Sequence, residues 1–431
     1  MDAYAKVLLI AIPGFIGLIL IEALYSWWKG NFTFRSMDTI SSLSSGTTNT
    51  LKSVLNLTLI IISYEWLVGK VALFEIQTTW LVWCLSFIAI DFASYWSHRL
   101  AHSINVFWNR HVVHHSSEEF NLACALRQSI SNLVSLGFIF LFPAALLGLP
   151  AKVIAVIAPI HLFMQFWYHT KHIPKLGWLE YILVTPSQHR VHHAINDIYL
   201  DKNLSAVFCV WDRLFGTFQE ELPEVPCVYG VKRAVATWNP IKINFQHFYS
   251  LLQDAWHAEN WWDKCRLWFM PTGWRPEDVV QKYPVDYTKN AAQQVKYDTP
   301  ASLALHLWSW FQFVLMTFLL LHMLMFLSKI GFPNLFVYGA FLALMIYSYS
   351  TLMDLQPSAI WWELTKSVLG IGVIYSTGDW FYLNELFAYG TIFLTSYFIL
   401  SVFVVAYFVQ FEIKALPFGQ LKSTDQITGV Q

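Results

Sequence analysis

The chain has 431 residues, of which 56% are hydrophobic and 13% charged, and its formal net charge is −1. The charged share is about half that of a soluble domain, so the composition indicates a polytopic membrane protein, and the charge balance excludes a nucleic-acid-binding protein. The five cysteines are scattered without a CxxC pair, which argues against iron–sulfur ligation and a disulfide framework and fits a reducing compartment.

Membrane-spanning helices need about 20 mainly apolar residues, and such stretches predict an all-α, polytopic helical bundle with about nine spans. Residues 7–28 are too long for a cleavable signal and form the first expected span. Glu65 and Lys366 are charges inside two of the candidates and weaken both. The candidates are residues 7–28, 54–74, 79–97, 130–149, 151–170, 303–327, 333–352, 358–378 and 385–410.

Lysine and arginine follow the first, third, fifth and ninth candidate spans. By the positive-inside rule these connections are cytoplasmic, so the amino terminus is expected outside. The histidine-rich segments then share the cytoplasmic side of a multi-pass protein. The sequence does not distinguish a bacterial inner membrane from an endoplasmic reticulum.

Four segments are expected along the chain: N-terminal membrane helices (1–78), a catalytic region (79–220), an aromatic cap (221–300) and C-terminal membrane helices (301–431). Residues 36–50 are small and polar, which predicts a short interfacial helix or a loop. Residues 240–276 combine charges with many aromatic side chains. Because tryptophan favours the membrane–water boundary, this stretch is expected to lie on the membrane surface above the catalytic region; the alternative is an ordinary soluble core.

Eleven of the fifteen histidines lie between residues 98 and 193. Eight of them form one HxxxH and two HxxHH groups, whose spacings place imidazoles on one face of a helix. Neutral imidazole binds iron, zinc, copper or nickel, and eight or nine nitrogens are more than one ion takes, so two metal ions are predicted. A single HxxxH pair is more often a surface feature, whereas three groups within a hundred residues are not. The eight are His98, His102, His111, His114, His115, His189, His192 and His193.

The sequence motifs that contain or adjoin these histidines resemble those of a known enzyme family. HRLAH (98–102), RHVVHHSSEEFNLACALRQS (110–129), QFWYHT (165–170), TPSQHRVHH (185–193), DKN (201–203) and WDRLFGTF (211–218) resemble the fatty acid hydroxylase/sterol desaturase superfamily, and within it the alkylglycerol monooxygenase group. The resemblance implies a membrane diiron enzyme in which the eight histidines, with His169, bind two iron ions.

The same resemblance implies an O2-dependent lipid monooxygenase. Its electrons would come from a donor protein or from a pterin such as tetrahydrobiopterin. Hydroxylation beside the ether oxygen of an alkylglycerol would give a hemiacetal that collapses to a fatty aldehyde and glycerol. The ether-cleaving enzymes are expected to have glutamate directly after the first histidine group, where this chain has Ser103.

Three polar residues are candidates to support the ligands: Asp91, Gln165 and Asn121. Asp91 lies about two helical turns before His98 and could accept a hydrogen bond from a ligand imidazole; equally, it could simply line the bundle. Glu118 and Glu119 follow the second group, where a bridging carboxylate or a helix cap are both conceivable. The other histidines are interpreted as packing, pocket or interfacial residues: His161, His172, His247, His257, His306 and His322.

Two alternatives remain open at this point. One is a related reaction of the same superfamily, hydroxylation or desaturation of a sterol, fatty acyl or carotenoid substrate. The other is a membrane metal-binding or transport protein. Transporters place ligands near the bilayer midplane, whereas these histidines are expected at helix ends, which favours an enzyme.

Overall fold

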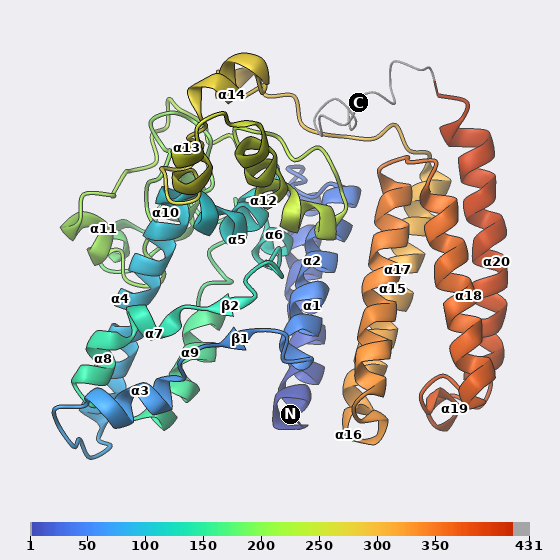
Figure 1. Ribbon diagram of the computed structural model, residues 1–431, viewed down its shortest axis with the longest axis horizontal. Helices are drawn as coiled ribbons and strands as arrows, with labels where there is room; N and C mark the ends of the chain where they lie inside the picture. Colours follow the sequence, from blue (N-terminus) through green and yellow to red (C-terminus); the bar gives the residue numbers. More distant parts are fainter. Residues whose placement is uncertain (1, 417–431) are drawn as a thin grey trace.

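The computed structural model describes residues 2–416, so the last part of the expected segment 301–431 lies outside the described residues. The described chain is mainly helical, with long irregular connections and two strands of two residues each (Figure 1). Its elements are α1 (Asp2–Trp28), α2 (Ser36–Val54), β1 (Leu59–Ile60), α3 (Tyr64–Val71), α4 (Trp80–Ser103), α5 (Asn105–His115), α6 (Leu122–Ala125), β2 (Val134–Ser135), α7 (Gly137–Phe140), α8 (Phe142–Leu146), α9 (Ala151–Phe163), η1 (Gly177–Tyr181), α10 (Pro186–His192), α11 (Val210–Leu214), α12 (Pro240–His257), α13 (Trp261–Arg266), α14 (Glu277–Lys282), η2 (Ala291–Gln293), α15 (Leu303–Met325), α16 (Leu327–Ile330), α17 (Asn334–Met353), α18 (Ala359–Thr377), α19 (Leu383–Leu386), α20 (Gly390–Tyr407) and η3 (Phe408–Ile413).

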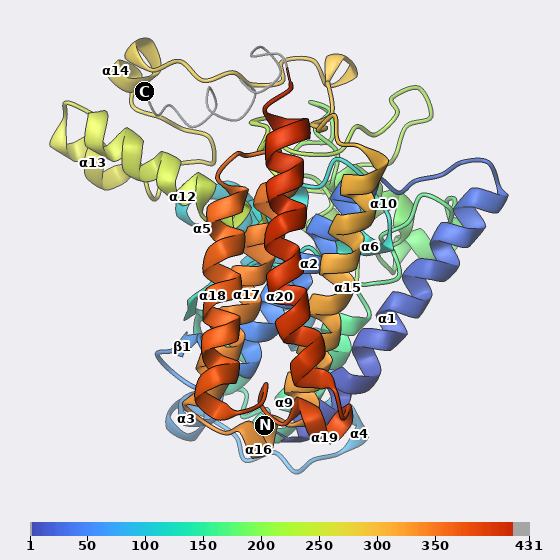
Figure 2. The same cartoon turned by 90° about the vertical axis from the view of Figure 1, so that its right-hand side faces the viewer.

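Long apolar helices confirm the expected all-α membrane protein, although not the expected number of spans. Within residues 2–416, five helices are long and apolar enough to cross a bilayer: most of α1, then α4, α15, α17 and the continuous α20–η3. α18 coincides with the expected span 358–378 and runs beside α17 and α20 (Figure 2), but its charges make it less apolar. α9 has 13 residues where 151–170 were expected to span.

Two of the expected spans, 54–74 and 130–149, are wrong as single helices. Each is broken into short pieces that pair with the other: Leu59 donates its backbone N–H to Leu133 (2.8 Å), and Leu73 donates to Leu146 (2.9 Å). β1 and β2 form a short parallel pair between them. Because backbone groups at membrane depth need internal partners, these cross-segment bonds replace those of a spanning helix. Hydropathy alone cannot separate the two cases.

The polar stretch 36–50 is neither a loop nor a surface helix. It begins α2, a 19-residue helix that is largely buried against α6, α12, α15 and α17. Several of its hydroxyls bond to the backbone one turn earlier: Ser44 and Thr39, for example, donate to the carbonyls of Ile40 (2.6 Å) and Arg35 (2.8 Å). Small side chains that bond to their own backbone in this way allow a polar helix to be packed inside the protein.

The charge that weakened the span 358–378 has its partner in the same helix. The Lys366 ammonium donates to the Glu363 carboxylate (2.5 Å) and to the Tyr397 hydroxyl (2.6 Å), and Ser348 donates to Glu363 (2.7 Å). Both charged side chains are completely buried between α17, α18 and α20. Glu65, in contrast, is exposed at the start of the short helix α3, so it does not lie in a span.

The aromatic stretch 240–276 folds as α12 and α13, which project sideways from the end of the bundle (Figure 2). α12 packs on α5: Asn109 accepts a hydrogen bond from the backbone N–H of Phe248 (2.9 Å). Trp256 and Trp261 are 82% and 78% exposed, so the segment is not an ordinary hydrophobic core. Its contact with the membrane surface stays a prediction.

Candidate metal centre

A sharp change of direction brings the first two histidine groups together. α4 ends at Ser103, and Ile104 takes an extended conformation before α5 begins. The side chain of Asn105 fixes this corner by donating to the carbonyls of Leu267 (2.9 Å) and Trp274 (3.0 Å). α5 therefore folds against the end of α4, and α10 adds the third histidine group from a distant part of the sequence.

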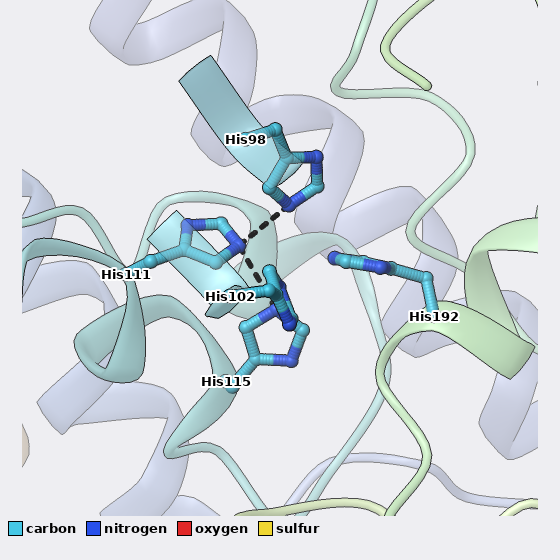
Figure 3. Close-up of side chains that lie close together, drawn as sticks. All are labelled: His98, His102, His111, His115 and His192. Atoms are coloured by element: carbon cyan, nitrogen blue, oxygen red, sulfur yellow. Dashed lines mark hydrogen bonds between the residues drawn. The ribbon is translucent and has the colours of Figure 1, made fainter. Parts of the chain in front are cut away.

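The structure brings all nine expected ligand residues together in two groups. Within each group, one ring nitrogen per residue lies within 4.8 Å of every other. Figure 3 shows the five-histidine group, in which the Nε2 atoms of His98 and His111 are 2.7 Å apart and those of His111 and His115 are 3.0 Å apart. The five-histidine group contains His98, His102, His111, His115 and His192, and the four-histidine group contains His114, His169, His189 and His193.

The two HxxHH motifs are each split between the groups, which the sequence did not predict. α5 places His111 and His115 in the five-histidine group and His114 in the four-histidine group. α10 does the reverse, because His189 and His193 join the four-histidine group and His192 joins the other. Residues four apart share a helix face, whereas adjacent residues are about 100° apart around the axis, so each motif serves both groups.

Hydrogen bonds on the outer side of the rings orient the inner nitrogens. The Nδ1 atoms of His98, His192 and His169 lie 2.7, 3.0 and 3.0 Å from the carbonyl oxygens of Leu204, Lys202 and Gln165. A carbonyl can only accept, so each Nδ1 carries the proton and each Nε2 keeps its lone pair. This is the arrangement that metal-binding histidines adopt.

The described residues fit a pair of metal ions. Two ligands at right angles on one ion, at about 2.1 Å each, have nitrogens about 3 Å apart, and the Nε2 separations of 2.7–3.2 Å match this. The buried Nε2 atoms of His102 and His192 have no hydrogen-bond partner in the described structure. Burial lowers the pKa of His114 to about 4, so its imidazole is neutral, as a ligand must be.

Asp201 supports the five-histidine group and was not anticipated as a site residue. Its carboxylate lies 3.0 Å from Nδ1 of His102, and it belongs to the DKN motif at 201–203, the one signal that could have pointed to it. The carbonyls of Lys202 and Leu204 follow directly and hold two further histidines. One short loop therefore orients three rings of the same group.

Replacing Asp201 by alanine is expected to weaken metal binding about tenfold, at the low end of such effects, because the Asp201 side chain is 66% exposed. Competition with a chelator would measure the change as loss of the bound metal at a lower chelator concentration. Asp197→Ala is the matched control, because Asp197 pairs with Lys232 on the surface (2.6 Å). Equal iron retention in the two variants would contradict the role given to Asp201.

Asp91 does not hydrogen-bond to any of the nine expected ligands, so the first of its two readings is wrong. Its carboxylate lies 2.7 Å from Nε2 of His161 and accepts from the indole of Trp211 (2.8 Å) and the backbone N–H of Val207 (2.9 Å). His98 instead uses the Leu204 carbonyl. Asp91 faces α9 and the loop after α10, positions that only the folded chain brings together.

The side chains of Gln165 and Asn121, the other two residues expected to support ligand histidines, have other partners. Gln165 contacts His169 through its backbone carbonyl, while its side chain lies 3.3 Å from His161. The side chain of Asn121 donates to the Thr33 carbonyl (2.8 Å) and caps α6 by accepting from the backbone N–H of Ala123 (3.0 Å). Thus only the backbone of Gln165 touches one of the nine histidines.

The acidic run after the second motif pairs with cations and does not bridge the histidine groups. Glu119 binds Lys296 (2.5 Å), and the backbone N–H of Tyr297 donates to Glu118 (2.6 Å). Both carboxylates also face Arg35. A carboxylate-bridged metal pair is therefore not the arrangement of this region.

A cavity of about 1000 Å³ leads to the histidines from the interior of the helix bundle. It lies between α1, α2, α4, α9 and α15, and its wall is mainly apolar, with Ile12, Phe15, Phe163 and Leu320 among the side chains. The cavity reaches both histidine groups. The histidines that line it are His98, His111, His114, His169 and His189.

Comparison with known proteins identifies the family. Residues 83–217 match the fatty acid hydroxylase family model. The chain is 34% identical to alkylglycerol monooxygenase of Homo sapiens over 362 residues, which cover 83% of this chain and 80% of that protein. The chain belongs to the alkylglycerol monooxygenase family. It is also 33% identical to the enzyme of Danio rerio, with the same coverage of 83% and 80%.

A shorter match links the alkylglycerol monooxygenase family to a bacterial lipid hydroxylase. The chain is 32% identical to ornithine lipid hydroxylase OlsE of Rhizobium tropici over 137 residues, 31% of this chain and 40% of that protein. No solved structure matches. The family membership confirms the resemblance drawn from the histidine motifs, and with the long apolar helices it makes the protein a membrane lipid monooxygenase and an oxidoreductase.

Proposed function

We propose that this monooxygenase hydroxylates the carbon beside the ether oxygen of an alkylglycerol lipid, using two iron ions bound by the five- and four-histidine groups. The observation that carries the proposal is the large, mainly apolar cavity that ends on histidines of both groups. A long alkyl chain can lie in such a cavity while its polar end reaches the histidines. The names of the full-length relatives supply the ether lipid as the substrate class.

Iron at these groups would supply the activation of O2. The net reaction consumes the lipid, O2, two electrons and two protons, and gives one water and a lipid hydroxylated at the carbon next to the ether oxygen. That product is a hemiacetal. Its hydroxyl proton moves to the ether oxygen as the C–O bond breaks, releasing a fatty aldehyde and glycerol.

Aromatic side chains pack against histidines of both groups. Rings of Phe120 and Tyr168 pack on His193 and His189 with centroids 5.3 and 4.2 Å apart, and Trp108 packs on His102 at 5.0 Å. Tight packing of apolar rings fixes the imidazoles and keeps competing water from the reacting carbon. The protein's own contribution is thus to hold and orient the imidazoles and to limit the access of water to the reacting carbon.

The electrons would reach the histidines through a second cavity, separate from the one proposed for the lipid. A second cavity of about 250 Å³ touches His102, His115, His192 and His193, none of which lines the larger cavity. Its wall is more polar and includes Arg233 and Asp254 among other charged residues. This is where a tetrahydrobiopterin-like reductant would fit; a donor protein docking near this opening is the alternative. The cytoplasm is the proposed compartment for this face.

The direct test supplies an alkylglycerol, O2 and a reductant to the purified protein. We expect a fatty aldehyde whose amount matches the O2 consumed. When 18O2 is used, one labelled oxygen atom is expected in the hemiacetal before it collapses, or in a derivative that traps it. Sterol and fatty acyl substrates are offered in parallel. Hydroxylated sterol or acyl product without any aldehyde would reject ether cleavage, and uptake of metal into vesicles without lipid oxidation would reject the enzyme altogether.

A further inference from the structure

One charged side chain faces the large cavity. Arg110 immediately precedes His111 on α5 and lines the cavity beside His98 and His111. Among the described residues that line this cavity it is the one Asp, Glu, Lys or Arg side chain. Its guanidinium donates to the hydroxyl of Ser97. One end of this mainly apolar cavity therefore carries a positive charge beside the histidines.

The charge of Arg110 is not offset within the described structure. No carboxylate within residues 2–416 forms an ion pair with it, whereas Arg127 pairs with Asp38 and Arg190 with Glu221. Burial lowers the pKa of Lys52, and the positive charge of Arg110 lowers it further. Burying a cation without a partner is costly, and a bound anion would remove that cost.

Other polar side chains line the same cavity from α2 and from the segment after α6. They include Asn49, Thr50 and Gln128. The part of the wall that α1, α9 and α15 form is mainly apolar. The cavity is therefore suited to an amphipathic molecule whose polar group lies beside α5 and whose chain extends between the membrane helices.

Resting on the proposed function, we infer that Arg110 binds the headgroup of the lipid and that the favoured headgroup carries a phosphate. Guanidinium groups recognise phosphate through paired, charge-assisted hydrogen bonds. In a glycerol ether the phosphate and the ether oxygen are separated by a single glycerol unit. Binding the phosphate at Arg110 places the carbon next to the ether oxygen by the adjacent histidines, so oxidation occurs at the headgroup end of the chain.

The test compares a 1-alkylglycerol with the corresponding 1-alkylglycerol 3-phosphate, using the iron-loaded protein in detergent. For Arg110→Gln we expect kcat/KM for the phosphate lipid to fall roughly 10- to 100-fold, mainly through KM, with a change of less than about threefold for the neutral lipid. Arg110→Lys keeps the charge and should retain part of the preference. Iron content is measured in every variant and is expected to stay unchanged.

Arg99→Gln is the matched control. Arg99 also adjoins a histidine of the five-histidine group, but it contacts the Tyr95 hydroxyl (3.0 Å) and the Phe215 carbonyl (3.3 Å), and does not line the cavity. It should keep the preference for phosphate. Equal losses for both lipids in Arg110→Gln, or a wild-type protein that does not distinguish them, would overturn the inference.

Binding of hexadecyl phosphate and hexadecanol, which contain no ether, separates this inference from the proposed reaction. Tighter binding of the phosphate that is lost in Arg110→Gln supports the headgroup site even if neither ether lipid is cleaved. Equal binding of the two compounds by the wild-type protein overturns it even if ether cleavage is observed.

Discussion

Replacing His114 or His192 by alanine is expected to lower lipid oxidation by more than about 100-fold, a larger effect than the loss of a residue that only supports a ligand. The two substitutions probe different groups, because His114 belongs to the four-histidine group and His192 to the five-histidine group. Both should also lower the iron content per chain, as measured by elemental analysis, while the protein remains inserted and folded.

His257→Ala provides the matched control for these two variants. His257 is exposed at the end of α12 and stacks on Tyr283 with ring centroids 4.1 Å apart, so its loss should leave iron content and activity near those of the wild type. Turnover retained in both His114→Ala and His192→Ala would contradict the assignment of the two groups as the metal site.

Replacing Asp91 by alanine is expected to destabilise the protein by about 3 kcal/mol or more, because a completely buried carboxylate leaves several donors unpaired. Those donors include His161, Trp211 and the backbone of Val207. The loop that carries Val207 also presents the Leu204 carbonyl to His98. The measurement is the midpoint of thermal unfolding in detergent, together with iron retention.

Two further variants sharpen the Asp91 experiment. Asp91→Asn keeps one acceptor oxygen and should be less destabilising than alanine. Glu385→Ala removes an exposed ion pair with Lys329, in which both side chains are about half exposed, and exposed pairs contribute little to stability. An unfolding midpoint of Asp91→Ala as high as that of Glu385→Ala would show that the buried hydrogen bonds are not important for the fold.

The spacing and local density of the histidines were sufficient to predict that the eight motif histidines meet, whereas His169 was expected only from the family resemblance. They could not predict how the histidines divide. That division depends on the angle between α5 and α10, which is set by contacts outside the motifs. The hydrogen-bond partners that orient each imidazole could not be predicted either, because backbone carbonyls such as that of Leu204 have no signature in the sequence.

Membrane helices were predicted well where the chain is apolar, long and unbroken, and poorly elsewhere. Residues 54–74 and 130–149 have the composition of spans, but they satisfy their backbone groups by pairing with each other. α2 is the opposite case, because its serines and threonines suggest an exposed segment, although their hydroxyls bond to their own helix or to distant residues such as Gln128 and Tyr349. In both cases long-range partners, absent from local composition, decide the outcome.

The division of each HxxHH motif has a consequence for assembly. α5 and α10 each contribute to both groups, and the rings of His115 and His193, one from each group, stack with centroids 4.4 Å apart. Rotating either helix would displace nitrogens from both groups at once. If each group binds one ion, as proposed above, the two ions should load cooperatively, so that empty and fully loaded chains predominate during maturation and a chain with a single ion is a minor species.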